Sequence, residues 1–224
     1  MNTVVRLTDF GGKPNSGEDT VVAMQLALEA IAAIEGPVVL ACDVGCYDFY
    51  PEHAAQLPSY ITNSASEQEN PNVTKTICVL FQGLRNVILE GNGSLFRFHG
   101  RCTMFVFENC ENVEICNLQT DFARPTMSEM TVETMGPQRM EVSVHRDSWY
   151  AIEDGKLYWK GEGWSYQDGP AQLYNPNTNT TWRVPNPLTT AIYVEEMEPF
   201  QLRIHYPPHA VPETAIGYTY QMRD

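Results

Sequence analysis

The chain has 224 residues, of which 43% are hydrophobic, so it is long enough to bury one large core or two smaller ones. It carries 28 acidic and 14 basic residues, a net charge of −14, and no basic cluster interrupts the acidic excess. This charge would repel phosphate backbones and anionic membranes, which excludes a nucleic-acid partner. No apolar run approaches the ~18 residues that a spanning helix needs, so we expect no membrane span. The composition favours a neutral or cationic ligand.

The first motif along the chain is the glycine-rich loop GGKPNSGEDT, residues 11–20, which leads into an apolar segment. Its Gly12 and Gly17 have the G-x-x-x-x-G spacing of a phosphate-binding loop. Such loops continue with Lys and then Ser or Thr, whereas here Glu18 and Asp19 follow and would repel a phosphate. We therefore interpret the loop as a turn and an acidic helix cap.

The segment that follows the loop predicts a helix over residues 18–34. Ser16 and Asp19 have the S-x-x-D spacing of a capping box, and the acidic residues favour the positive end of a helix dipole. The helix is apolar on nearly every side. We therefore expect it to lie against an apolar surface.

Two segments after the helix resemble each other. TICVLFQGLRNVILEGN from Thr76 and CTMFVFENCENVEICNL from Cys102 align at a shift of 26 residues, which places Val87 on Val113. A strand, a turn and a second strand at such a period predict the stacked coils of a parallel β-helix, whose first coil the apolar helix would cover. The alternative is an antiparallel sandwich with a chance similarity.

The second half of the chain has a different pattern. From about Met127, MTVETMGPQRMEVSVHR and WYAIEDGKLYWKGEGW alternate apolar and polar residues around tight turns, and EDGK at residues 153–156 predicts a hairpin. We expect two domains: residues 1–126 with the cap helix and the first β-helix coils, and residues 127–224 as an antiparallel β domain. The strand-like AIGYTYQMRD at the end has no cap, which predicts the N-terminal part of a longer protein.

Six cysteines lie in the first half of the chain: Cys42, Cys46, Cys78, Cys102, Cys110 and Cys116. Their spacing matches neither a dense disulfide framework nor paired C-x-x-C zinc knuckles. Cys42 and Cys46 come nearest to a metal pair, but no histidine completes a set. We therefore interpret the six as small buried hydrophobic residues, and we expect no metal site and no cofactor.

Longer stretches resemble known families. TDFGGKPNSGEDTVVAMQLALEA resembles the N-terminal motif of the pectate-lyase-like (pectin-lyase-like) superfamily of right-handed parallel β-helices. YDFYPEHAAQLPSYITNS and GLRNVILEGNGSLFRFHGRCTMFVFENCENVEICNLQTDFARP resemble the bacterial α-1,3-galactosidases of glycoside hydrolase family 110, above all in YPE, FHGR and DFARP. The resemblance covers about residues 4–132. It implies a mainly β protein, a right-handed parallel β-helix with an N-terminal capping helix and an inserted antiparallel β-barrel or sandwich.

The same resemblance implies a function. Members of that family are glycoside hydrolases that remove terminal α-1,3-linked galactose from blood-group-B-type glycans with inversion, so a carbohydrate substrate is expected. They are longer than this chain, and their catalytic carboxylates lie after the insertion. The resemblance therefore implies no catalytic residue within these 224 residues and an inactive isolated chain. It also implies a secreted, periplasmic or cell-surface location in a bacterium, and a homo-oligomer is compatible with the sequence.

Three residues are candidates for substrate binding. Asp121 and Arg124, in TDFARPT, lie where the chain leaves the first domain. They form either a structural ion pair or turn cap, or the edge of a sugar cleft in which Asp121 accepts from hydroxyls and Arg124 orders it. Trp164 is a candidate for stacking on galactose, although aromatic residues in a small β domain are usually core. His99, in FHGR, is interpreted as a turn histidine.

Two other functions fit parts of the sequence. A non-catalytic β-helix module that binds glycans or builds a surface structure would share the fold motif and need no acids in a cleft. A polysaccharide lyase fits less well, because the cluster of aspartates that holds calcium in such enzymes does not occur here.

Overall fold

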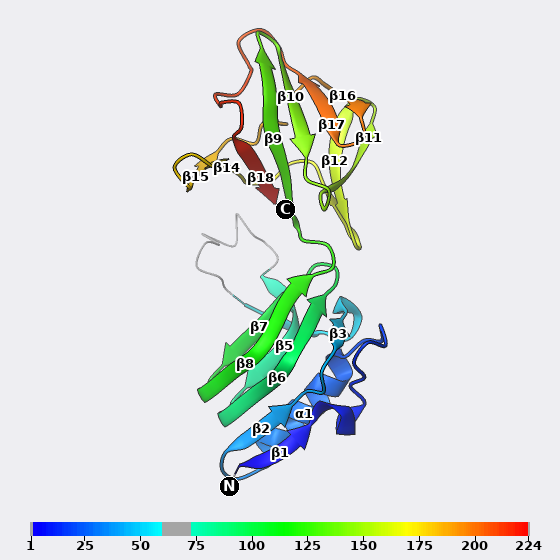
Figure 1. Ribbon diagram of the computed structural model, residues 1–224, viewed down its shortest axis with the longest axis vertical. Helices are drawn as coiled ribbons and strands as arrows, with labels where there is room; N and C mark the ends of the chain where they lie inside the picture. The colour runs from blue at the N-terminus through cyan, green and yellow to red at the C-terminus, as the bar shows by residue number, and fades with distance from the viewer. Residues whose placement is uncertain (1, 60–72, 224) are drawn as a thin grey trace. The chain divides into compact units, whose positions relative to one another are not determined.

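The computed structural model describes residues 2–59 and 73–223. It divides into two compact units, Met1–Ala123 and Arg124–Asp224, each with its own hydrophobic core (Figure 1). The elements of unit 1 are β1 (Thr3–Arg6), η1 (Leu7–Phe10), α1 (Val21–Ala32), β2 (Val38–Ala41), β3 (Cys46–Phe49), η2 (Pro51–His53), β4 (Ala55–Pro58), β5 (Thr74–Gln82), β6 (Arg85–Phe98), β7 (Thr103–Glu108) and β8 (Glu111–Phe122). Those of unit 2 are β9 (Met127–Gly136), β10 (Arg139–Val144), β11 (Trp149–Glu153), β12 (Lys156–Gly161), β13 (Trp164–Tyr166), β14 (Ala171–Asn175), β15 (Thr180–Val184), β16 (Tyr193–Glu198), β17 (Gln201–His205) and β18 (Thr219–Arg223).

Unit 1 has two sheets around one core. The larger sheet has the order β1-β2-β6-β3 with β8 also on β6, and all its pairings are parallel. The smaller sheet has the order β4-β5-β7. The long strand β6 bends at Gly91, where a Cβ would lie 2.5 Å from the carbonyl oxygen of Asn117 in β8. Only glycine allows the two strands to approach this closely at the bend.

Residues that are 26 positions apart in the two similar segments pair with each other in neighbouring parallel strands. Val79 pairs with Phe105 in β5 and β7, and Val87 pairs with Val113 in β6 and β8. At the turn before the second pair, Asn112 Nδ2 donates to Asn86 Oδ1 at 2.8 Å, and the two residues have φ values of 54° and 53°. Asparagine tolerates this left-handed backbone better than most residues.

The expected right-handed parallel β-helix is wrong for the described residues. The repeat supplies a single parallel pair in each of two sheets and no series of coils. The neighbouring strands depart from a coil, because β4 is antiparallel to β5, and β2 and β3 both pair with β6. From Met127 the sheets are antiparallel. The plan of the pectate-lyase-like superfamily, which needs repeated stacking to bury its core, is therefore not shown.

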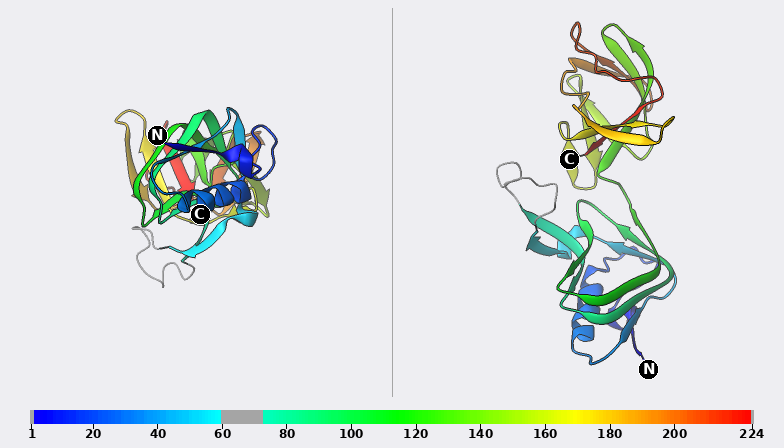
Figure 2. Two further views of the ribbon diagram at one scale, coloured as in Figure 1. Left: turned by 90° about the horizontal axis from the view of Figure 1, so that it is seen from below. Right: turned by 90° about the vertical axis from the view of Figure 1, so that its left-hand side faces the viewer.

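Helix α1 begins at Val21, later than the capping-box spacing predicts. Ser16 Oγ donates to the carbonyl of Lys13 and accepts from the amide of Glu18, so it closes the loop and does not cap the helix. The N-cap residue is Thr20, whose side chain makes no capping bond, and Asp19, one residue earlier, accepts the amide of Val21 with its Oδ1 at 3.0 Å. One face of the helix is buried in the core of unit 1, alongside the strands (Figure 2).

Unit 2 is an antiparallel β structure. Its main sheet has the order β15-β14-β18-β9-β10-β17-β16, and β11-β12-β13 form a second, three-stranded sheet. The two sheets meet where the amide of Val194 in β16 donates to the carbonyl of Gly155 at 2.7 Å. Glu153 pairs with Lys156, and Asp154 and Gly155 have positive φ values, so the predicted hairpin is confirmed.

Candidate functional site

Three parallel strands of unit 1 bring a row of charged side chains together. The register of β3, β6 and β8 aligns Asp48 with Arg97 and Arg97 with Asp121. The flanking residues Phe49 and Phe98 are buried in the core. Because side chains alternate along a strand, the three charged residues lie on the opposite face of the sheet. We call Asp48, Arg97 and Asp121 the charged row.

Asp48 is the fixed end of the charged row. Its side chain is 1% exposed, and its Oδ1 accepts hydrogen bonds from Arg97 Nε at 2.6 Å and His99 Nε2 at 2.8 Å. Burial acts to raise the pKa of Asp48, but the hydrogen bonds from Arg97 and His99 outweigh it, so the pKa lies below its usual value. Asp48 is therefore a fixed anion at neutral pH and no proton donor.

Tyr50 and Asp19 connect the neighbouring segments to this part of unit 1. The ring of Tyr50 stacks on the imidazole of His99, with centroids 4.0 Å apart and planes at 14°. Asp19 Oδ2 pairs with His53 Nδ1 at 2.9 Å, and Asp19 Oδ1 accepts the amides of Val21 and Tyr50. The glycine-rich loop therefore ends in a carboxylate that ties α1 to β3 and η2.

Asp121 lies at the exposed end of the charged row. Its Oδ1 accepts the amide of Phe122 at 2.8 Å, and the described residues show no ion pair between Asp121 and either Arg97 or Arg124. The other oxygen of this carboxylate is open to a ligand. The role of Asp121 in binding a sugar stays a prediction.

Arg124 and Trp164, two of the predicted substrate-binding residues, lie against each other in unit 2. The guanidinium carbon of Arg124 is 5.4 Å from the ring centroid of Trp164 and 5.6 Å from that of Trp149. Arg124 is 1% exposed, Nη1 donates to the carbonyl of Pro125, and burial lowers the pKa of the guanidinium. Trp164 is 7% exposed and also stacks on Tyr166, so its ring is largely covered.

Glycoside hydrolysis makes a specific demand on one carboxyl group. A general acid in a glycosidase has a raised pKa, because it must stay protonated near neutral pH. The pKa shifts that the structure resolves for carboxylates are all downward and belong to Asp48, Glu90, Glu141 and Glu195. Within residues 2–59 and 73–223, no group of three or more His, Cys, Asp or Glu side chains could hold a metal ion. The charged row itself consists of a buried carboxylate, its arginine partner and an exposed carboxylate, which are groups that can hydrogen-bond a polar ligand.

The sequence reasoning missed Asp48 and Arg97. A signal was present, because YDFY and FRFH each place a charged residue between aromatic ones, and alternation predicts that such residues share the outer face of a sheet. The pattern does not tell which strand pairs with which, because nothing local in the sequence links Asp48 to a strand that begins at Arg85.

One further finding concerns the helices. None in the described ranges combines the length and apolar character that crossing a bilayer requires.

Comparison with known proteins gives consistent matches. Residues 128–214 match the family model described as GLAA-B beta-barrel domain I. The chain is 34% identical over 221 residues to alpha-1,3-galactosidase A of Bacteroides fragilis strain YCH46, which covers 98% of this chain and 36% of that protein. It is 33% identical over 212 residues to alpha-1,3-galactosidase A of Bacteroides thetaiotaomicron, with 94% and 37% covered. For alpha-1,3-galactosidase B of Akkermansia muciniphila, the identity is 32% over 176 residues, with 78% and 21% covered.

The two Bacteroides relatives align with nearly the whole chain, across both units, whereas the chain spans little more than a third of their length. The matched barrel model lies within unit 2, where the structure has its antiparallel sheets. The chain is a homologue of bacterial proteins named alpha-1,3-galactosidase A and B and contains the β-barrel domain of their family model.

Proposed function

We propose that this chain is part of an inverting glycoside hydrolase that removes terminal α-1,3-linked galactose, as in blood-group-B-type glycans. The observation that carries the proposal is the 34% identity over 98% of the chain to a protein named alpha-1,3-galactosidase A. The chain spans 36% of that relative's length, so the activity of the whole protein is part of the proposal.

The chain itself would supply scaffold and binding groups without the catalytic pair. This part of the proposal is supported by the downward pKa shift of Asp48 and by its two hydrogen bonds, which fix it as an anion. In the proposed role, the open oxygen of Asp121 accepts from sugar hydroxyls, while Arg97, between the two carboxylates in the register, keeps the local charge near balance.

Galactose release tests the proposal. Residues 1–224 and the full product of the encoding gene are each incubated with α-1,3-galactobiose, and free galactose is measured by anion-exchange chromatography. We expect release by the full product alone, with β-galactose as the first anomer seen by NMR because inversion changes the configuration of an α-linked sugar. Release by the isolated chain would overturn the scaffold role, and α-galactose as the first product would overturn inversion.

Asp121→Asn in the full product tests the binding role separately. An amide keeps the shape of the side chain but removes its charge, so we expect a higher KM for α-1,3-galactobiose with kcat little changed. Gln119→Ala, on the same strand and exposed, is the matched control. An unchanged KM in Asp121→Asn would remove Asp121 from the site.

A further inference from the structure

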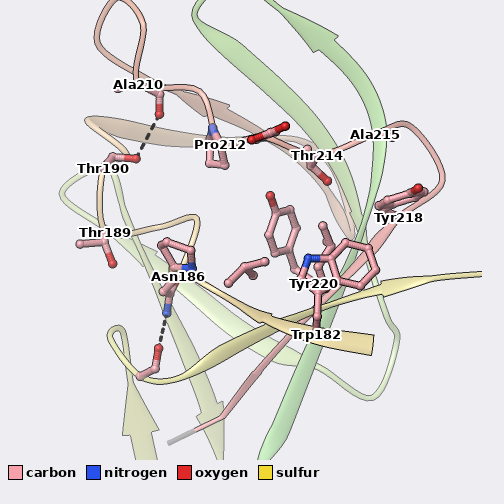
Figure 3. A pocket seen from close by; sticks show the side chains of 15 residues that line it. Trp182, Asn186, Thr189, Thr190, Ala210, Pro212, Thr214, Ala215, Tyr218 and Tyr220 are labelled. Atoms are coloured by element: carbon pink, nitrogen blue, oxygen red, sulfur yellow. Dashed lines mark hydrogen bonds between the residues drawn. The ribbon is translucent and has the colours of Figure 1, made fainter. Parts of the chain in front are cut away.

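Unit 2 contains a recess that the proposed function does not use. It has a volume of about 920 Å³ and lies beside the edge strand β15, between that strand and the loops of residues 185–190 and 210–218 (Figure 3). Pockets that hold small molecules measure roughly 300–1,000 Å³ and recur at the mouths of β-barrels. The recess is therefore large enough for a sugar of one or two rings.

The floor of the recess is a row of apolar side chains across three strands. Trp182 in β15 pairs with Leu173 in β14, and Leu173 pairs with Tyr220 in β18, so the three share one face of the sheet. Leu173 and Tyr220 are buried, but Trp182 is 42% exposed. The ring of Tyr218 meets Trp182 edge-on, with centroids 6.0 Å apart and planes at 83°. Trp182 keeps much of its side chain exposed beside this contact, and Figure 3 shows Trp182 and Tyr218 together at one end of the recess.

Two of the polar side chains around the recess hold its wall in place. Asn186 Nδ2 donates to the carbonyl of Gly169 and its Oδ1 accepts the amide of Leu188, at 3.1 and 2.9 Å. Thr190 Oγ1 donates to the carbonyl of Ala210 at 3.2 Å and so joins the two loops (Figure 3). The wall is therefore formed before a ligand arrives, which lowers the entropy cost of binding.

Further polar groups belong to the lining of the recess. Burial raises the pKa of the Tyr220 phenol, and the nearby Thr214 hydroxyl offsets part of that rise. Thr214 Oγ1 is buried near that phenol, and no group among the described residues forms a hydrogen bond of good geometry with it. Buried polar groups are normally paired, so this hydroxyl calls for a partner that a ligand or water supplies. Glu213 and Thr189 add acceptors to the lining.

The charge of the lining restricts the ligand. None of the fifteen lining residues is Lys, Arg or His, one is a carboxylate, and the chain as a whole carries −14, so an anion would be repelled. A quaternary ammonium ion would need several aromatic faces around it, whereas Tyr220 is buried and Trp182 and Tyr218 are perpendicular to each other. An uncharged ring with an apolar face and several hydroxyl groups fits one exposed indole and a rim of hydroxyl, amide and carboxylate groups.

We propose that the recess bounded by Trp182, Asn186 and Thr214 is a binding site for a neutral saccharide. The site lies in unit 2, so it is separate from the charged row of unit 1. It would hold the protein on a glycan whether or not the proposed hydrolysis takes place, and it goes beyond that proposal.

Titration of the 224-residue chain with sugars tests the site. The probes are methyl α-galactopyranoside and α-1,3-galactobiose, with choline as the cation and galacturonate as the anion. We expect a saccharide to bind with a Kd on the order of 1 mM by calorimetry and to change tryptophan fluorescence. Choline or galacturonate binding more tightly than both neutral sugars, or no neutral sugar binding at about 10 mM, would overturn the proposal.

Variants locate the binding. Trp182→Ala should weaken it at least about tenfold and abolish the fluorescence change, Trp182→Phe should have an intermediate effect, and Thr214→Val, which keeps the shape of the side chain, should weaken it several-fold. Trp149→Ala removes an exposed tryptophan outside the recess, so it should bind the sugars as the parent chain does. Circular dichroism checks that each variant is folded. Wild-type affinity in folded Trp182→Phe and Thr214→Val would show that the sugar binds elsewhere and would overturn the proposal.

Discussion

Among the described residues, unit 1 buries the carboxylate of Asp48 and unit 2 buries the guanidinium of Arg124, and the two charges have opposite kinds of surroundings. In unit 1, the carboxylate of Asp48 receives two donors, Arg97 and His99, at 2.6 and 2.8 Å. In unit 2, the guanidinium of Arg124 lies against the rings of Trp149 and Trp164, and its Nε and Nη2 have no hydrogen-bond partner among the described residues. The buried carboxylate of unit 1 is therefore paired and hydrogen-bonded, whereas the buried guanidinium of unit 2 is covered by aromatic rings.

The contrast shows what each arrangement contributes to stability. Removing one partner of a buried ion pair leaves the others uncompensated, which is costly. A buried cation without a neighbouring anion has lost its hydration and has no ion pair to offset that cost. Replacing it with an apolar side chain of similar size can therefore leave the stability nearly unchanged.

All four tryptophans, residues 149, 159, 164 and 182, lie in unit 2, so their fluorescence reports the unfolding of that unit, while far-ultraviolet circular dichroism reports the unfolding of both units.

The largest effect is expected from Asp48→Asn. The amide keeps the size of the side chain but removes the charge that Arg97 and His99 face, so we expect unit 1 to lose about 2–3 kcal/mol. In urea titrations, the dichroism transition should move to lower urea while the fluorescence transition stays in place. Asp121→Asn, at the exposed end of the same row, is the control and should move neither. Equal shifts of the dichroism and fluorescence transitions in Asp48→Asn would show that the two units do not unfold independently.

Gly91→Ala should have the next largest effect, again confined to unit 1. The new Cβ would lie 2.5 Å from the carbonyl oxygen of Asn117 and 2.9 Å from the Cα of Leu118, and backbone atoms cannot move aside as a side-chain end can. Overpacking of this kind typically costs 1–3 kcal/mol, so we expect about 2 kcal/mol from the dichroism transition. Gln119→Ala, exposed on β8, serves as the comparison. A wild-type midpoint for Gly91→Ala would mean that the bend is not as tight as described.

The pH dependence of unit 1 provides a third test. The pKa of Asp48 is lower in the folded protein than in the unfolded chain, so its stabilisation is fully present above the unfolded value of about 3.9 and is lost as the pH falls through the folded value. The stability gap between the parent chain and Asp48→Asn should therefore be constant from pH 7 down to about 5 and narrow below about pH 4. Urea midpoints by circular dichroism at several pH values measure this gap. A gap that widens in acid would contradict the assignment.

The smallest effect is expected from Arg124→Met. Methionine fills a similar volume and removes a desolvated charge, so the urea midpoint from tryptophan fluorescence should stay within about 1 kcal/mol of the parent chain, in contrast to Asp48→Asn. The emission maximum should shift, because the charge beside two indole rings is gone. A loss of about 3 kcal/mol or more would indicate that Nε and Nη2 of Arg124 do have hydrogen-bond partners in the folded protein.

The local features of the fold could be predicted from the sequence, and the long-range ones could not. The 26-residue shift became the register of β5 with β7 and of β6 with β8, because apolar residues at matching positions bury best side by side. The hairpin at Asp154 and Gly155 followed from residues that accept a positive φ. Extending one repeat to a β-helix was wrong, since a single similarity does not determine how β2, β3 and β4 pair.

The candidate site follows the same division. TDFARPT drew attention to Asp121 and Arg124, but side-chain positions depend on which strands meet: Asp121 is at the end of a row that begins at Asp48, and Arg124 packs on tryptophans from β11 and β13. The recess at Trp182 is formed by strands and loops brought together by the sheet order of unit 2, and no local pattern in the sequence marks it.

The carboxylate of Asp19 has a consequence for the motions of unit 1. Its Oδ1 is a single acceptor shared by the amides of Val21, at the start of α1, and Tyr50, the residue directly after β3. Any fluctuation that withdraws this oxygen releases both amides at once, although they are far apart in the chain. In hydrogen-exchange experiments the two protons should therefore behave as one cooperative group, with the opening of the helix start and of the strand end recorded at the same rate.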